Sequence, residues 1–246
     1  MPKPPRTTRN KLLDAFPAGA LARLAPHLEL VPLAPGEVLY DSGDELKFVY
    51  FPTAGVVSLL KVMTTGEVAE IAVVGNEGML GISTFLGDGI TPSRAVVQSK
   101  GLGQRLDQRL LTKEFNREAP VLRLLLRYTQ TVIAQMAQAA ACNRHHSIEQ
   151  RLCRVLLESL DRLPTNTITT THGQIAAMLG VRREAISEAA GRLRHAGLIQ
   201  THRGKMTVLD RPGLEKAACE CYKVVRSAFN RLFKESPRGK RLRVSG

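Results

Sequence analysis

No stretch of the sequence is both long and apolar, and this absence excludes several classes of protein. Every hydrophobic run is shorter than the roughly 18 residues that a membrane-spanning helix needs, so we predict no membrane contact. The basic residues 1–6 are followed by no apolar segment that could make them a signal peptide. We therefore expect a cytoplasmic protein. Its 246 residues are enough to bury the core of one or two domains.

Sequence motifs for metal binding and redox chemistry are also lacking. The four cysteines, Cys142, Cys153, Cys219 and Cys221, include no Cys-x-x-Cys pair, and no histidine lies at a usual zinc-ligand spacing from them. On one helix, Cys219 and Cys221 would point apart. We therefore predict no metal ligand and no certain cofactor. The cysteines are interpreted as buried or free thiols, with a redox or metal role as the alternative.

Residues 30–110 contain no histidine, although their pattern is that of a β-rich domain. Short β-branched runs alternate there with glycine turns such as Thr53-Ala54-Gly55, which is typical of a β-sandwich or jelly roll. A cupin-like metalloenzyme would need histidine and carboxylate ligands on neighbouring strands. The lack of histidine argues against an enzyme, and we predict no catalytic residue. Residues 1–10, which precede this region and one or two short helices, are expected to be disordered.

Positive charge is concentrated in the C-terminal part of the chain. The sequence has 35 Lys and Arg against 22 Asp and Glu, which gives a net charge of +13. Residues 147–246 hold 19 of the basic and 9 of the acidic residues. Such a basic region suits a polyanion, because each neutralised phosphate releases counterions. We expect double-stranded DNA as the partner. The basic tail 236–246 is predicted to be flexible and to make at most nonspecific phosphate contacts.

Residues 119–146 have the apolar spacing of one long helix. Two adjacent registers are apolar, so the helix presents a broad stripe, one side for the β domain and one for a partner helix. The expected interface of a symmetric homodimer is Leu122, Leu126, Thr129, Ile133, Met136 and Ala140. A helix buried within one chain is the alternative. The stripe fades near Asn143 and Ser147, where we expect a hinge with His145 and His146 as solvated linker residues.

The stretch from Thr171 to Arg194 has the pattern of two short helices joined by a tight turn. Thr171 can cap the first helix with Gln174 as its capping-box partner, and Gly180 can end that helix in a left-handed conformation. In the second helix, apolar residues recur at helical spacing and the residues between them are polar. This pattern predicts a helix-turn-helix whose second helix enters a major groove, with an ordinary helical hairpin as the alternative.

Basic and polar side chains surround this motif. After the second helix, two short strands around Arg203-Gly204-Lys205 predict a hairpin wing whose cationic tip reaches a phosphate. One further amphipathic helix is expected over residues 211–233. The residues predicted to contact DNA are Thr171, Arg182, Arg183, Glu184, Ser187, Glu188, Arg192, Arg203 and Lys205.

This order of elements resembles the Crp/Fnr superfamily of bacterial transcription regulators over roughly residues 12–210. The resemblance implies an α+β fold with a cyclic-nucleotide-binding-like β jelly roll over residues 11–118. A long dimerisation helix with its hinge would follow over 119–146, and a winged helix-turn-helix with a C-terminal helix over 147–235. The resemblance also implies a homodimer that regulates transcription from pseudo-palindromic DNA in response to a small effector. RNA polymerase is a further candidate partner.

The most specific part of the resemblance is Arg183-Glu184-x-x-Ser187, at the reading positions of the recognition helix. Arg183 would donate to guanine or a nearby phosphate, Glu184 would accept from a cytosine amine, and Ser187 would touch a thymine methyl or an adjacent base edge. The family often has arginine at the next position, where this chain has Glu188. A half-site that differs from the common one at that base pair is therefore expected.

The effector site departs further from the family pattern. Its glycine-rich cassette is matched by a segment between Gly78 and Gly81, in which Met79 replaces the ribose-binding glutamate. The phosphate-binding pair is matched by Arg94 and Ala95, with alanine in place of serine. By this resemblance, the residues that would hold an effector of unknown identity are Gly78, Gly81, Arg94 and Ala95.

The residues that bind the effector or cofactor in the best-known sensors of this family are also missing. Met136 and Ala137 stand where hydroxyl residues would meet adenine. Each lost polar partner costs about 1–3 kcal/mol, so we expect no physiological response to cyclic AMP. No cysteine precedes Cys142, which argues against an N-terminal iron–sulfur cluster, while a haem needs only one ligand and stays open. The leading hypothesis is a DNA-binding transcription regulator; the alternative is a ligand-sensing module that acts mainly through a protein partner.

Overall fold

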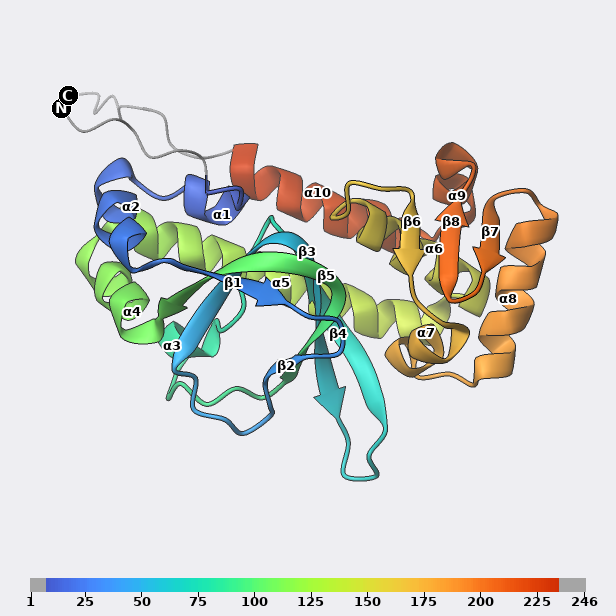
Figure 1. The fold of residues 1–246 in the computed structure, drawn as a ribbon, viewed down its shortest axis with the longest axis horizontal. Helices are drawn as coiled ribbons and strands as arrows, with labels where there is room; N and C mark the ends of the chain where they lie inside the picture. Colours follow the sequence, from blue (N-terminus) through green and yellow to red (C-terminus); the bar gives the residue numbers. More distant parts are fainter. Residues whose placement is uncertain (1–7, 235–246) are drawn as a thin grey trace, which may run out of the picture.

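The computed structural model describes residues 8–234 and divides the chain into a β-rich part, one long helix and a smaller mixed part (Figure 1). The long helix α5 (Ala119–His145) passes behind the sheet in this view and leads to the C-terminal part. The predicted α+β class is confirmed. The tail 236–246 lies outside the described residues. Among residues 8–234, no helix combines the length and the hydropathy that a bilayer crossing requires.

The first described residues are held against the sheet by one side chain. Asn10 is fully buried, and its side-chain oxygen caps the first helix by accepting from two backbone amides. Its amide nitrogen donates to the carbonyl oxygens of Pro52 and Gly78, each at 2.8 Å. The expected disorder of residues 1–10 is therefore wrong for residues 8–10. The helices that follow are α1 (Lys11–Asp14), α2 (Ala18–Leu24) and the 3-10 helix η1 (Ala25–His27).

Five strands form one antiparallel sheet in the order β1-β5-β3-β4, with β2 also paired to β5. The strands are β1 (Glu29–Leu33), β2 (Val38–Tyr40), β3 (Phe48–Val62), β4 (Val68–Val74) and β5 (Arg94–Asp107). β3 and β5 pair along most of their length and arch over α5 (Figure 1). The curved sheet thereby encloses a core that is closed on one side by the long helix.

The sequence predicts a turn at Thr53-Ala54-Gly55, and this prediction is wrong. The segment stays within β3, where the register against β5 shifts. Gly55 adopts φ +86, and a Cβ at Gly101 on the opposing strand would lie 1.9 Å from the Ala54 carbonyl oxygen. Two glycines thus allow the backbones to come close at an irregularity that bends the strand. Two runs expected as separate strands form one long strand.

The short helix α3 (Ser83–Leu86) lies between β4 and β5, and α4 (Gln108–Arg117) connects β5 to α5. A short break follows α5. The buried side of α5 places Val121, Leu125 and Val132 in the core of the β-rich part. After α5, the Ser147 side chain and Gln150 form a capping box that starts a new helix. The predicted interruption between the long helix and the C-terminal part is confirmed, because this cap prevents continuation of α5.

The C-terminal part packs helices around a small three-stranded sheet in the order β6-β8-β7. Its elements are α6 (Ile148–Leu160), β6 (Thr167–Thr169), α7 (His172–Leu179), α8 (Arg183–His195), β7 (Ile199–His202), β8 (Lys205–Val208), α9 (Arg211–Ala217) and α10 (Glu220–Lys234). The wing strands β7 and β8 are as predicted. Strand β6 was not predicted; it pairs with β8 and joins the wing to the rest of this part.

The single helix expected over residues 211–233 is instead two helices. Asp210 caps α9, and the backbone becomes extended at Ala218 before α10 begins. α10 then leaves the C-terminal part: Val225 and Phe229 are buried with the core of the β-rich part. The last helix therefore lies along α5 and connects both parts of the molecule (Figure 1). The expected domain boundary assigned this helix wholly to the C-terminal domain. In the structure α10 also packs on the β-rich part.

Candidate nucleic-acid interface and effector cavity

Helices α7 and α8 form the predicted helix-turn-helix. The Thr171 side chain accepts from the Gln174 amide, and the Gln174 side chain accepts from the Thr171 amide, so the capping box is present. Gly180 ends α7 at φ +62, in the left-handed region that glycine adopts without steric cost. The buried side of α8 consists of Ile186, Ala189, Ala190 and Leu193. These small and branched residues let α8 pack closely on α6 and α7, which fixes its direction.

The opposite side of α8 faces away from the protein core over its first turns. Arg183, Glu184, Ser187 and Glu188 lie on this side and are all exposed, as predicted. The Ser187 hydroxyl donates to the Arg183 carbonyl oxygen at 3.1 Å and lies 2.9 Å from Nδ1 of His172. A row of hydrogen-bonding groups with both donors and acceptors therefore points away from the molecule, as needed to read base edges.

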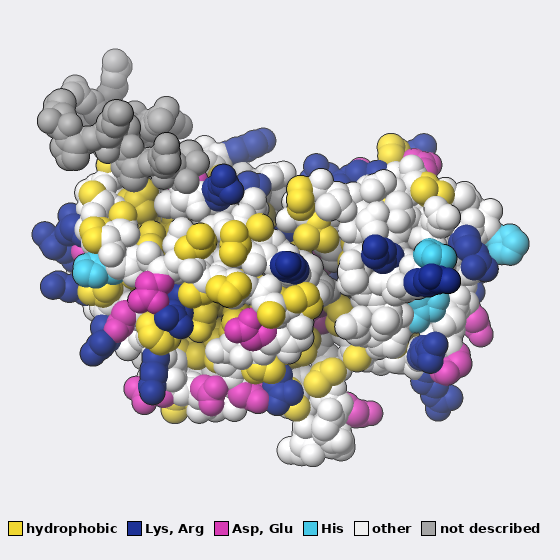
Figure 2. Space-filling model, in the orientation of Figure 1, with side chains coloured by type: hydrophobic (Ala, Val, Ile, Leu, Met, Phe, Trp, Pro, Cys, Tyr) yellow, Lys and Arg dark blue, Asp and Glu magenta, His cyan; other side chains and the backbone are white. Residues whose placement is uncertain are grey.

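A groove runs from the start of α8 to the wing. It has a volume of about 510 Å³ and is lined by Thr170, Thr171, His172, Gly173, Arg183, Thr201, His202, Arg203, Gly204, Lys205 and Met206. At the wing tip, Arg203 adopts φ +40 and Gly204 adopts φ +75, which makes the tight turn between β7 and β8. Lys205 and Arg203 are exposed there. Basic side chains gather on this end of the molecule (Figure 2), so the groove suits a phosphate backbone.

His172 is a member of this groove that the sequence reasoning missed. It follows the cap residue Thr171 and faces Ser187 across the motif. Partial burial, with the charges of Arg183 and Arg194, lowers the pKa of His172 below its ordinary value. A neutral imidazole at neutral pH can accept from, or donate to, the serine hydroxyl. The sequence did contain a signal for this role. His172 directly follows the helix cap Thr171, and residues in the first turn of α7 lie beside the groove.

The predicted contacts Arg192 and Arg182 are placed differently from the rest. The Arg192 Nε atom lies 2.5 Å from a carboxylate oxygen of Glu149 on α6. This arginine therefore links α8 to α6 and does not line the groove. Arg182 is exposed at the N-cap of α8, where it makes no capping hydrogen bond with its side chain. The groove residues and the start of α8 are therefore the strongest candidates for DNA contact.

The segment that resembles an effector cassette is filled by the protein itself. The Tyr128 hydroxyl of α5 donates to the Met79 carbonyl oxygen at 2.7 Å and accepts from the Met79 amide at 2.9 Å. A Cβ at Gly78 would lie 2.4 Å from this hydroxyl, so only glycine allows the approach. Met79 itself is 1 % exposed. A residue of the long helix thus occupies both backbone polar groups of Met79, in the segment that resembles the cassette.

The other effector residues are also engaged or enclosed. Arg94 donates from Nε and Nη2 to both carboxylate oxygens of Asp41, at 2.9 and 2.6 Å, and Ala95 is buried. Gly81 lines a cavity of about 50 Å³ whose walls are largely apolar. Pockets for small-molecule ligands commonly have volumes of about 300–1,000 Å³. This cavity is too small for a nucleotide, and Arg94 does not line it.

The predicted dimer stripe on α5 is divided between two environments. Leu126 is 43 % exposed and Ile133 is 57 % exposed, and Ala140 is exposed as well. Leu122 is half-buried, Thr129 is buried, and Met136 packs against the core of the β-rich part. On this helix the free apolar face is therefore shifted toward Ala137, which is exposed. The side of α5 that carries Arg127 is covered by α10.

A buried polar cluster joins the sheet to α6. The Arg162 Nε atom lies 2.7 Å from a carboxylate oxygen of Glu77, and both side chains are less than one tenth exposed. Nearby, Arg154 pairs with Glu158 on α6, and the Ser58 hydroxyl donates to Glu70 on β4 at 2.7 Å. The ion pair of Glu77 and Arg162 thus adds a buried polar contact between the two parts of the chain.

Sequence families match both parts of the chain. The cyclic nucleotide-binding domain family matches residues 30–117, and the Crp-like helix-turn-helix domain family matches residues 150–217. Among curated proteins, no sequence matches the chain.

Solved structures match across both parts. FixK2 from Bradyrhizobium japonicum is 18% identical, with a TM-score of 0.67 over 78% of this chain and 98% of that chain. A CRP-family transcriptional regulator from Thermus thermophilus, TTHB099, is 22% identical, with a TM-score of 0.65 over 76% of this chain and 96% of that one. CLP, the c-di-GMP responsive global regulator of Xanthomonas campestris, is 14% identical, with a TM-score of 0.63 over 79% and 100%. At these identities the likeness is one of fold.

Proposed function

We propose that this chain, which belongs to the Crp/Fnr superfamily of transcription regulators, binds a palindromic DNA operator as a homodimer without responding to cyclic AMP. The observation that carries the proposal is the groove between the start of α8 and the wing. It combines base-reading groups on α8 with cationic groups at the wing tip, and both line the same groove of the winged helix-turn-helix. The helix would enter the major groove while the wing contacts the backbone.

The reading residues have separate roles in this proposal. Arg183 lines the groove and forms no ion pair with another of residues 8–234, so it is available to donate to guanine. Glu184 accepts from a cytosine amine. Ser187, which His172 orients, touches the neighbouring base edge. Glu188 repels a guanine edge and a phosphate alike, so the base pair opposite it should differ from one that an arginine would select.

The test is selection of binding sites from random DNA, followed by fluorescence anisotropy on the selected site at two salt concentrations. Arg183→Ala should cost about 1–3 kcal/mol on that site and relax the preference at one base pair. Lys205→Ala should weaken binding to all sequences alike. It should also reduce the slope of the logarithm of affinity against the logarithm of salt concentration by about one. Arg109→Ala, a change at an exposed arginine of the β-rich part, is the matched control and should change neither quantity.

Two outcomes would contradict the proposal. If selection recovers no sequence preference, α8 is not a reading helix, and the alternative of a sensor that acts through a protein partner becomes the better hypothesis. If selection recovers a preference that Arg183→Ala leaves unchanged, DNA binding occurs, but through another surface.

The homodimer is supported by the free apolar face of α5. Leu126, Ile133, Ala137 and Ala140 recur at spacings of seven, four and three residues and are all exposed. Such a stripe on a long helix can pack on its own copy about a twofold axis, with small alanines near the hinge allowing close approach. A twofold pair of recognition helices is what a palindromic site requires.

Sedimentation at several concentrations tests this interface. Ile133→Glu would place two carboxylates against each other across the axis and should shift the protein to monomers. Leu30→Glu replaces a residue that is 60 % exposed on β1 and is the control, which should leave the association state unchanged. Dimers that persist in Ile133→Glu at low concentration would show that another surface carries the contact.

The lack of a cyclic AMP response is supported by the occupied cassette. Tyr128 holds both polar groups of Met79, and Arg94 is committed to Asp41. A nucleotide would have to displace these partners and enlarge the cavity beside Gly81. Titration calorimetry with cyclic AMP should therefore give no heat of binding, and a micromolar dissociation constant would contradict this proposal.

A further inference from the structure

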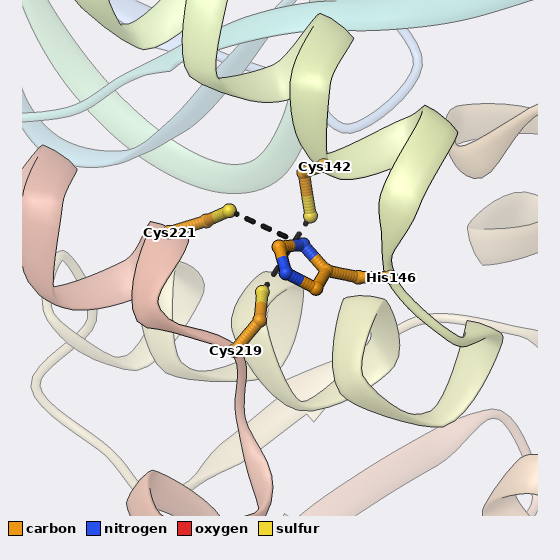
Figure 3. A group of neighbouring side chains, drawn as sticks. All are labelled: Cys142, His146, Cys219 and Cys221. Atoms are coloured by element: carbon orange, nitrogen blue, oxygen red, sulfur yellow. Dashed lines mark hydrogen bonds between the residues drawn. The ribbon is translucent and has the colours of Figure 1, made fainter.

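Three cysteines and one histidine converge beside the break between α5 and α6 (Figure 3). Cys142 lies in the last turn of α5, and His146 is the residue that ends this helix. Cys219 precedes α10 and Cys221 lies in its first turn. Their ligand atoms, three sulfurs and one imidazole nitrogen, all lie within 4.8 Å of one another. The three cysteines are buried, and His146, expected as a solvated linker residue, is half-buried beside them.

This convergence depends on the division of the C-terminal segment into two helices. On one continuous helix, Cys219 and Cys221 would point in different directions. The extended backbone at Ala218 places Cys219 outside α10, so both sulfurs turn toward α5. Cys142 lies in the last turn of α5 and His146 is its C-cap, four residues further on, a spacing that puts two side chains on the same side of a helix end. The sequence reasoning interpreted the cysteines as buried or free thiols and His146 as a solvated linker residue, and it missed the site.

The distances in this cluster fit the edges of one tetrahedron. The sulfurs of Cys142 and Cys219 are 3.6 Å apart, and the Cys221 sulfur is 3.4 Å from Nδ1 of His146. With Zn–S bonds of about 2.3 Å and Zn–N bonds of about 2.0–2.1 Å, tetrahedral edges are about 3.8 Å between sulfurs and about 3.6 Å between sulfur and nitrogen. An iron–sulfur cluster distributes its four protein ligands over two or more irons and needs wider spacing between some of them.

The groups around the cluster favour metal binding. The Nε2 atom of His146 lies 3.2 Å from a carboxylate oxygen of Glu220, which can hold the Nε2 proton and leave Nδ1 free as a ligand. The Gln138 side-chain amide donates to the Cys221 sulfur at 3.0 Å. Three thiolates and Zn²⁺ would carry one net negative charge. The guanidinium of Arg154 interacts electrostatically with Cys142 and can compensate for it.

We propose that Cys142, His146, Cys219 and Cys221 bind one Zn²⁺ ion that clamps the end of α5 to the start of α10. Four protein ligands leave no open position, so the ion has a structural role. The clamp fixes the chain on both sides of the hinge, since α5 ends there and α10 returns from the winged part. A disulfide between Cys142 and Cys219 would require their sulfurs to approach to about 2.05 Å and would leave the other two ligands unused.

The first experiment measures the metal content and mass of the purified full-length protein. Native mass spectrometry and elemental analysis should find one zinc per chain, which denaturation releases. Cys219→Ala should lose the zinc, and Cys153→Ala, the matched change at a buried cysteine outside the cluster, should keep it. A metal-free chain lighter by two hydrogens would indicate a disulfide and overturn the proposal. Iron with inorganic sulfide, or no uptake of added Zn²⁺ by the reduced protein, would also overturn it.

A milder variant guards against a general loss of folding. Glu220 is largely exposed, and Glu220→Gln removes the carboxylate that orients His146 without touching a ligand. Loss of such a partner typically weakens metal affinity about 10- to 100-fold. A competition titration with a chromophoric chelator should show this decrease for Zn²⁺, while Glu215→Gln on α9 serves as a control and should not. Equal affinities in all three proteins would show that Glu220 does not support a metal ligand and would count against the proposed site.

The clamp itself has a separate readout. Hydrogen exchange of the full chain should be slow at residues 143–147 and 218–222 with zinc bound and faster after chelation, with little change in the β-rich part. Exchange that is unchanged on removal of zinc would retain the site but overturn its role as a clamp. None of these measurements involves DNA, so their failure is distinguishable from failure of the proposed DNA binding.

Discussion

The buried carboxyl group of Glu70 should make the stability of this protein depend on pH. Glu70 lies on β4 at the junction with α6 and is 9 % exposed. Loss of solvation raises its pKa from 4.5 to about 7, and the nearby charge of Glu158 acts in the same direction. The hydroxyl of Ser58 and the charges of Arg154 and Arg162 act in the opposite direction but do not cancel the desolvation.

The sign of the effect follows from the two pKa values. Between about pH 4.5 and pH 7, the folded chain keeps a proton on Glu70 that the unfolded chain loses. The stabilisation is therefore fully present below pH 4.5, decreases as the pH rises through this interval, and is absent above about pH 7. A tenfold difference in proton affinity is worth about 1.4 kcal/mol, so the whole effect is about 3 kcal/mol at most.

Glu70→Gln resembles the protonated side chain and should remove this dependence. We expect the variant to be more stable than the natural sequence by about 3 kcal/mol or less at pH 8 and about equal to it at pH 4. Urea unfolding followed by circular dichroism measures both values, since the chain has no tryptophan for fluorescence. Glu67→Gln, at an exposed position of the β3–β4 turn, is the control. The same free-energy difference at both pH values would refute the reasoning.

Three further predictions concern the stability of the fold, two at buried polar contacts and one at a glycine with positive φ. Arg162→Met leaves the buried carboxylate of Glu77 unpaired and should destabilise the fold by about 3–5 kcal/mol in urea unfolding, with a milder loss when Glu77→Gln is added. Tyr128→Phe deprives both backbone groups of Met79 of their partner and should cost about 1–3 kcal/mol, without creating cyclic AMP binding in calorimetry. Gly180→Ala, at φ +62 with open space around it, should cost about 1–2 kcal/mol through the backbone alone; a neutral or stabilising result in thermal unfolding would contradict this.

Local signals in the sequence were sufficient for the helix-turn-helix. The capping box at Thr171, the glycine at position 180 and the inward spacing of α8 are each set by residues close in sequence, and all are found in the structure. The break after the long helix was predictable for the same reason, because Ser147 and Gln150 complete a cap within one turn. The wing was predictable from its short strands and their glycine turn.

The remaining features depend on packing between distant segments. No local pattern indicates that Gly55 and Gly101 pass each other, so one bent strand was mistaken for two. The occupied cassette is decided by Tyr128, which reaches it from α5 across 49 positions of sequence.

The cysteines show the same division between sequence and structure. The four-residue spacing of Cys142 and His146 is enough to place them on the same side of a helix end. Whether they form a site depends on α10, because no local pattern predicts that α10 packs on α5. Only the tertiary structure brings Cys219 and Cys221 to them, because the direction of α10 is set by burial of its apolar side on α5. Sequence determines which groups are present and their local periodicity; long-range burial determines which of them meet.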